Sequence, residues 1–216
     1  MRQMMFSDAV KFVPWIDVHG YSQSDVKVLF VGESHYASPA HATDRELTID
    51  VVHQARVGQL NRQSGKGFFT NIAALAKGRL LSPEDREAWW PTVAFYNYIQ
   101  VPVGQGPRVQ FNLELFNDAH QAFHNVIETI RPELVVVLGR RVWFNMSTKT
   151  VGSHQNLKCS EVDAVYREAW RYSVGGGETA LSFHVRHPSS GFNFRTFNPL
   201  FRSALAEVAK GPKERG

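Results

Sequence analysis

Potentially reactive side chains follow the first strongly apolar run of the chain, residues 28–31. That run ends at Gly32, and the four residues after it each carry a polar group: Glu33, Ser34, His35 and Tyr36. Glycine allows the backbone to turn sharply and to approach a ligand closely. A carboxylate or an imidazole in such a loop can orient a water molecule or remove its proton. The segment is therefore a candidate catalytic loop, although an ordinary exit from a strand could have the same composition.

A second candidate segment begins at His187, directly after the last apolar run of the chain, residues 180–185. Pro188 makes the turn rigid, and the hydroxyl groups of Ser189 and Ser190 can bind a phosphate together with backbone amides. An imidazole beside a breaking bond can stabilise the anion that leaves. The segment is a candidate site for an anionic ligand or leaving group, and a purely structural turn is the alternative.

Aromatic and basic residues extend this second segment: Phe192, Phe194 and Arg195. A phenylalanine ring can insert between stacked bases when one base leaves a nucleic-acid helix, and an arginine can contact the phosphates. Packing in the core is the alternative role for the two rings. The segment as a whole is compatible with contact to nucleic acid.

Regular elements must hold these two segments, and four apolar runs predict strands: residues 28–31, 93–96, 134–138 and 180–185. The third run is apolar throughout, as in a strand covered on both faces. Helices are predicted between and after the strands: residues 44–57, 68–77, a helix starting at Ser82, 116–130, 161–172 and 198–209. This alternation predicts an α/β fold, a three-layer αβα sandwich around a central four-stranded parallel sheet.

In such a sheet the ligand site lies at the carboxyl ends of the strands. The predicted strands lead into Gly32, Asn97, Gly139 and, after Arg186, His187. We therefore expect the two candidate segments to meet at one edge of the sheet.

Composition sets limits on the class of protein. The chain has 216 residues, which suits one domain; we predict that domain over residues 1–209 and a flexible tail over residues 210–216. The net charge of +4 and the pI of about 9.3 permit nucleic-acid binding. A single cysteine, Cys159, excludes an internal disulfide and a four-thiolate iron–sulfur cluster.

The sequence also bears on location and cofactors. It has neither a secretory leader pattern nor an apolar run of membrane-spanning length, so we predict a cytoplasmic monomer without membrane association. His120 and His124 have a spacing that can bind zinc but lack the adjacent glutamate of the metalloprotease motif. We predict no metal and no other cofactor.

The two candidate segments together resemble the uracil-DNA glycosylase superfamily. Residues 28–36 are similar to its first motif, a strand that ends in glycine and variable catalytic positions, and His187-Pro188-Ser189 matches its His-Pro-Ser turn. Tyr96-Asn97 resembles the position of the asparagine that reads the base edge. Residues 131–140 and 67–72 are similar to the third strand and to the aromatic start of an early helix. The resemblance spans residues 27–206.

This resemblance implies an enzyme that flips a damaged or modified base out of DNA and hydrolyses its N-glycosidic bond. Glu33, with Ser34 and His35, would form the catalytic loop that orients water, and His187 would stabilise the departing base. The implied base-binding residues are Gly32, Tyr36, Phe68, Phe69 and Asn97. The implied DNA-binding residues are Ser189, Ser190, Phe192 and Arg195.

The chain departs from known branches of the superfamily at Ser34, where several branches have an acid or an amide. The branch with glutamate at the position of Glu33 holds an iron–sulfur cluster, which this chain lacks the cysteines to bind. We therefore predict a divergent branch that removes uracil or another modified pyrimidine, in base excision repair or in defence against modified foreign DNA.

Two other functions remain open from the sequence. Gly32-Glu33-Ser34 and His187-Pro188 also resemble the catalytic blocks of the SGNH esterases, with Ser34 as nucleophile and His187 as base. In that family an aspartate stands three residues before the histidine, where this chain has His184. A DNA-binding module that has lost catalysis is the third possibility.

Overall fold

The computed structural model describes residues 5–60, 66–104, 113–146, 151–158, 166–189 and 191–210. Ser190, Cys159 and tail residues 211–216 lie outside the described residues. The centre of the fold is a mixed seven-stranded sheet in the order β1-β3-β2-β4-β7-β6-β5. Its strands are β1 (Trp15–Ile16), β2 (Val28–Gly32), β3 (Val93–Asn97), β4 (Leu134–Leu138), β5 (Val151–Lys158), β6 (Tyr166–Ser173) and β7 (Thr179–Val185).

Four neighbouring strands of this sheet are the ones predicted from the apolar runs. In the order β3-β2-β4-β7 each pairs in parallel with the next. The whole sheet is larger and mixed, because antiparallel strands extend the four predicted strands on both sides. β1 pairs with β3, and the β5–β6 hairpin pairs with β7.

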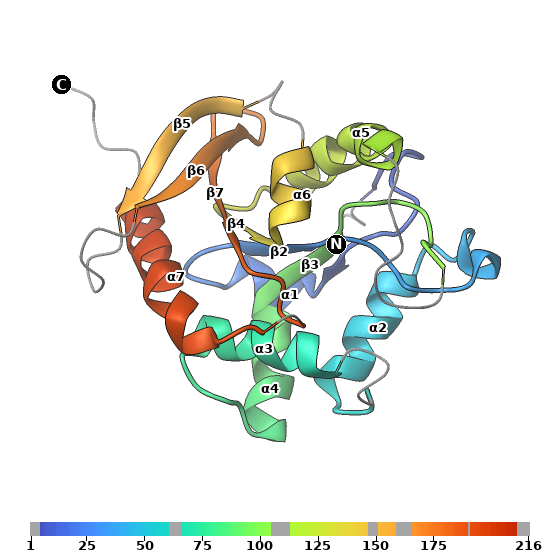
Figure 1. Cartoon of the computed structure of the whole chain (residues 1–216), viewed down its shortest axis with the longest axis horizontal. Coiled ribbons are helices and arrows are strands. Elements are labelled where there is room, and N and C mark those ends of the chain that lie inside the picture. Colours follow the sequence, from blue (N-terminus) through green and yellow to red (C-terminus); the bar gives the residue numbers. More distant parts are fainter. Residues whose placement is uncertain are drawn as a thin grey trace.

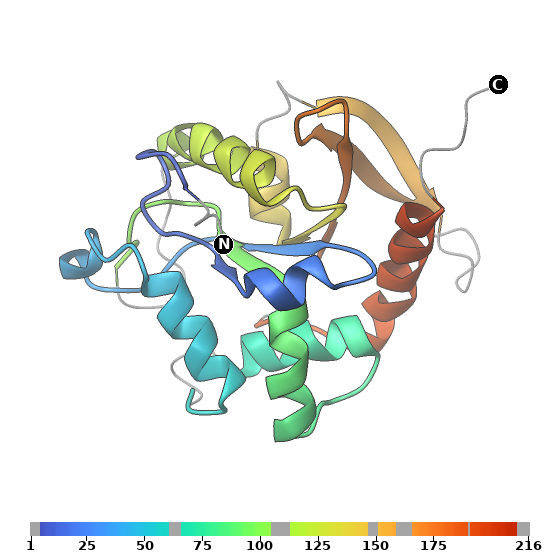
Figure 2. The ribbon, with the colours of Figure 1, turned by 180° about the vertical axis from the view of Figure 1, so that it is seen from behind.

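Helices cover both faces of the sheet, as Figures 1 and 2 show from opposite sides. The helices are α1 (Val18–Ser22), α2 (Leu47–Arg56), α3 (Lys66–Lys77), α4 (Pro83–Trp89), α5 (Leu113–Ile130), α6 (Arg140–Asn145) and α7 (Phe194–Ala209), with short 3₁₀ helices at Pro39–His41 and Trp90–Thr92. Val28 and Phe30 of β2 pack against α2, α3, α4 and α7, and Leu29 and Val31 pack against α5 and α6. This alternation along one strand produces the two apolar layers.

One predicted helix is instead a strand. The sequence predicts a helix over residues 161–172, whereas residues 166–173 form β6, which pairs with both β5 and β7. Trp170 and Tyr172 favour extended structure, and pairing on both sides satisfies the backbone of β6. The contacts that decide this conformation come from strands distant in sequence.

The last helix begins earlier than predicted, at Phe194 in place of Asn198. The Asn193 side chain caps it by accepting a hydrogen bond of 3.0 Å from the Arg195 N–H. Pro199 therefore lies inside α7. Because of the earlier start, the helix follows the His187 turn closely.

Candidate functional site

The loop after β2 is fixed by backbone hydrogen bonds that continue beyond the end of β3. The amide of Tyr98 donates to Gly32 O over 3.0 Å, and the amide of Ile99 donates to Glu33 O over 2.9 Å. The amide of Val103 donates to His35 O over 3.0 Å. The backbone of the predicted catalytic loop is therefore paired with the segment after β3.

Glu33 is buried, with 6% of its surface exposed, and it forms an ion pair with Arg141 of α6. Arg141 donates from Nε to Glu33 Oε1 and from Nη2 to Oε2, the second bond measuring 2.6 Å. This bidentate geometry matches the two oxygens of a carboxylate and holds the group in one orientation. Burial opposes the charge of Arg141, but the hydrogen bond to Glu33 is the larger effect and raises the pKa of the guanidinium. The carboxylate is thus fixed at the end of β2.

Arg141 is a site residue that the sequence did not single out. Gly139 connects β4 to α6 with a φ angle of 135°, a conformation that favours glycine, and α6 begins at the next residue. Arg141 then lies in the first turn of α6, opposite the end of β2. The signal in the sequence was an arginine two residues after the glycine that ends the third predicted strand.

Asn97, at the end of β3, is positioned by His35 and Gly32. Its Nδ2 atom lies 3.2 Å from Nε2 of His35, which also lies 2.8 Å from Oγ1 of Thr48 in α2. A Cβ atom on Gly32 would lie only 2.3 Å from Asn97 Oδ1, so the amide needs glycine at position 32. Burial lowers the pKa of His35 to about 4. His35 is therefore neutral near pH 7. Since an amide nitrogen can only donate, Nε2 accepts from Asn97 in the tautomer that carries its proton on Nδ1.

This arrangement places His35 behind Asn97, buried against the edge of the Phe12 ring at a centroid distance of 4.9 Å. The expectation that His35 assists in orienting water has no support in these contacts. Its observed contacts are those of a residue that positions the Asn97 amide.

His187 follows β7, near enough to Glu33 and Arg141 for their charges to act on its pKa. Its Nδ1 atom accepts a hydrogen bond of 3.2 Å from the Ser189 amide, which leaves the proton of the neutral imidazole on Nε2. Burial lowers the pKa of His187, the charge of Glu33 raises it, and the charge of Arg141 lowers it again. The net lowering keeps His187 neutral near pH 7, with an N–H available as a donor.

The His187 turn is held by α3. Nδ2 of Asn71 donates to Pro188 O over 2.8 Å. The ring of Phe68 lies 5.2 Å from the His187 ring, tilted by 40°. Phe68, Asn71 and His187 thus form one contact group at the edge of the site, and Asn71 was not among the predicted site residues.

The neighbouring aromatic residues have different positions from those predicted. Phe69 is buried against Phe95 and Trp90 in the core, so only Phe68 of the predicted pair lies at the site. Phe194 is buried, and Phe192 stacks on Phe197 at 5.2 Å. Neither ring projects freely toward a base step.

Four further predicted residues lie at the surface or outside the described chain. Ser189 and Arg195 are exposed, as contacts to phosphate require, and Ser190 lies outside the described residues. Tyr36 has 44% of its surface exposed, so its ring lies at the rim of the site.

The esterase alternative requires a hydrogen bond between the Ser34 hydroxyl and the His187 imidazole. Among the residues that the structure describes, Ser34 Oγ is buried and has no hydrogen-bond partner, and Nδ1 of His187 accepts from Ser189. His184, in the place of the orienting aspartate, packs 5.2 Å from Trp143. The nucleophile, base and acid of an esterase are therefore not assembled in the described part of the chain.

In the described ranges no group of three or more His, Cys, Asp or Glu side chains could hold a metal ion. Within the same ranges, no helix has the length and apolarity needed to cross a membrane. Comparison of the sequence with protein-family models and with curated proteins returns no match.

Proposed function

We propose that this protein is a DNA glycosylase that flips a modified pyrimidine out of DNA and hydrolyses its N-glycosidic bond. The observation that carries the proposal is that three groups follow the carboxyl ends of strands in one parallel set: the Glu33 carboxylate, the Asn97 amide and the neutral His187 imidazole. The resemblance of the first motif and of the His-Pro-Ser turn to the uracil-DNA glycosylase superfamily supports it. A uracil-DNA glycosylase-like fold is part of the same proposal.

Base recognition is assigned to Asn97. One of its Nδ2 protons bonds to His35, and an amide has a second N–H and a carbonyl oxygen for the edge of a pyrimidine. Phe68 would stack on the extruded base beside His187, which its ring already contacts. A pyrimidine presents both donors and acceptors on its edge, which is the pattern that an amide can match.

Bond cleavage is assigned to His187. When the bond between C1′ of the sugar and the base nitrogen breaks, its electron pair moves to the base, which leaves as an anion. The Nε2–H of neutral His187 donates a hydrogen bond to a carbonyl oxygen of that base. A preorganised donor of this kind contributes about 10²–10³-fold to the rate in other enzymes.

Water attack is assigned to Glu33. The carboxylate accepts a hydrogen bond from the water whose oxygen forms the new bond to C1′, and it takes up the proton of that water. Each carboxylate oxygen has a second lone pair beyond the bond to Arg141, so the ion pair is compatible with this role. Arg141 acts on the reaction by positioning Glu33.

Release of bases from DNA tests the proposal. The purified protein is incubated with DNA that contains uracil or another modified pyrimidine, and alkali-labile abasic sites are measured. We expect release from one substrate and loss of release in Glu33→Gln and His187→Ala, with DNA binding retained. Glu84→Gln and His19→Ala are matched controls at exposed positions and should behave as the wild type.

The identity of the released base would decide the biological role. Release of uracil fits base excision repair, and release of a bulky modified cytosine fits defence against modified foreign DNA. Near-normal release in both site variants would contradict the assigned mechanism. DNA binding with no release from any substrate would favour a binding module instead.

A further inference from the structure

Two exposed aromatic side chains belong to the segments that carry the Glu33–Arg141 pair, the loop after β2 and helix α6. Among the residues that the structure describes, only two of the exposed large hydrophobic side chains are aromatic, Tyr36 and Phe144. Phe144 has 61% of its surface exposed and Tyr36 has 44%. Exposed aromatic rings cost free energy in water, so their position at one site points to a ligand.

Tyr36 lies near this ion pair, and Phe144 stands on the same helix as Arg141. Tyr36 follows the catalytic loop, and burial and the charge of Glu33 raise the pKa of its hydroxyl, while the charge of Arg141 lowers it. Phe144 stands three residues after Arg141 on α6, and residues with this spacing share one side of a helix. Val142 and Trp143, on the opposite side of α6, are buried against the core.

The charge of this surface is positive. Arg140 is exposed and lies over the Phe144 ring, with its guanidinium carbon 5.5 Å from the ring centroid. α6 carries two arginines and no acidic residue, and Arg141 already offsets the charge of Glu33. We define Tyr36, Arg140 and Phe144 as the rim surface.

We propose that the rim surface binds unpaired DNA, with Tyr36 and Phe144 stacked on bases that neighbour the extruded nucleotide and Arg140 in contact with the phosphate backbone. Aromatic rings combined with basic side chains are how proteins bind single strands without sequence preference. Base pairs in an intact duplex do not offer free faces to two rings, so the preferred substrate is a single strand or a melted region. This inference rests on the proposed function, because that function is the reason for taking DNA as the partner.

Binding of unmodified oligonucleotides tests it without any base release. The probe is a fluorescein-labelled oligothymidine of about 12 nucleotides, within the site sizes of single-strand binding folds. A second probe of equal length has the same sugars and phosphates but no bases. Affinities are measured by fluorescence anisotropy, and a duplex of the same length serves as competitor.

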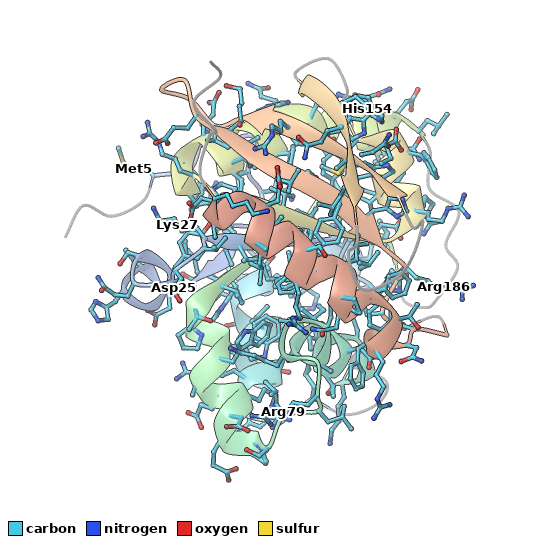
Figure 3. All side chains as sticks on the ribbon, turned by 90° about the vertical axis from the view of Figure 1, so that its left-hand side faces the viewer. Met5, Asp25, Lys27, Arg79, His154 and Arg186 are labelled. Carbon is cyan, nitrogen blue, oxygen red and sulfur yellow. The ribbon has the colours of Figure 1, made fainter. Side chains whose placement is uncertain are left out.

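We expect Phe144→Ala to lower the affinity for oligothymidine by about 5- to 150-fold, the range known for stacking on one base, and to leave the affinity for the base-free strand unchanged. Arg140→Ala should weaken both probes alike and reduce the dependence of binding on salt. Leu80→Ala is the control. Leu80 is 60% exposed and adjoins Arg79, which Figure 3 shows at the α4 end of the molecule, away from Arg186.

Three results would each overturn the inference. They are an equal loss of affinity for both probes in Phe144→Ala, no loss of affinity for oligothymidine in that variant, and tighter binding of duplex than of single strand by the wild type. Because Phe144 is exposed, its truncation should not disturb folding, and an unchanged melting temperature verifies this. Base release by the wild type with normal oligothymidine binding in Phe144→Ala would refute this inference alone. The reverse result is a lower affinity of Phe144→Ala for oligothymidine together with no base release by the wild type. It would refute the proposed catalysis alone.

Discussion

Replacement of Gly32 by alanine would show whether the site depends on the close approach of Asn97 to the end of β2. A Cβ atom there would lie 2.3 Å from Asn97 Oδ1 and 3.0 Å from Cζ of Phe95. Gly32 is not among the glycines with positive φ, so alanine meets no backbone strain at this position. The Asn97 amide must therefore move by about 1 Å to restore an ordinary carbon–oxygen separation.

The size of the effect follows from that displacement. Overpacking of this kind costs about 1–3 kcal/mol of stability, which corresponds to a decrease in melting temperature of roughly 2–12 °C for a chain of this length. A misplacement of about 1 Å at a reacting site lowers the rate by about 10²-fold. We expect Gly32→Ala to show both changes, because the displaced amide also leaves His35.

Thermal unfolding and base release measure the two effects, and two comparisons make the test specific. Gly67→Ala is the matched control, since a Cβ atom at position 67 meets nothing within 4 Å. In an Asn97→Ala background the clash with the amide is gone, so the added cost of Gly32→Ala should fall well below its cost in the wild type. Wild-type stability and activity in Gly32→Ala, or fully additive costs with Asn97→Ala, would refute the explanation.

Three further predictions concern residues around this centre. Arg141→Met should lower the stability measured by urea unfolding by about 1–3 kcal/mol, because the buried Glu33 carboxylate loses two charge-assisted hydrogen bonds. It should also reduce base release. Arg141→Lys should restore part of the stability and part of the release, and equal effects of the two substitutions would argue against a positioning role. The pKa of about 4 for His35 lies below its unfolded value near 6.5, so its contribution is full above pH 6.5 and is lost as the pH falls toward 4. Urea unfolding between about pH 7 and pH 4 should show a loss of about 3 kcal/mol from this residue, and His35→Gln should remove that part of the slope. Asn71→Ala should reduce base release more than it reduces the melting temperature, because it frees the turn that holds His187; unchanged kcat with a changed melting temperature would indicate that Asn71 is only structural.

The four parallel strands were predictable because each is a short apolar run that is buried on both faces. The three added strands were not. β1 has only two residues, and β5 contains His154, Gln155 and Asn156 within an eight-residue strand. Their conformation depends on pairing with neighbours in the sheet, which no local pattern records.

The site was predictable in part for a related reason. Gly32, Asn97 and His187 stand at strand ends, and the topology of a parallel sheet brings such ends together. Arg141 was missed because its partner is distant in sequence, and the link depends on the φ angle of Gly139 and on the start of a six-residue helix. Phe69 was assigned to the site because sequence alone does not tell which of two adjacent phenylalanines faces the core.

The hydrogen bonds from the segment after β3 to the carbonyls of Gly32, Glu33 and His35 have a consequence for how the site works. They extend the ladder of the sheet into the proposed catalytic loop, so this loop belongs to the same cooperative unit as the core strands. Its conformational entropy is lost when the chain folds and need not be lost again when a ligand arrives. Glu33 and Asn97 are thus attached to a backbone that is ordered in advance of binding, and under the proposed function the ordering on binding would fall mainly on the nucleotide.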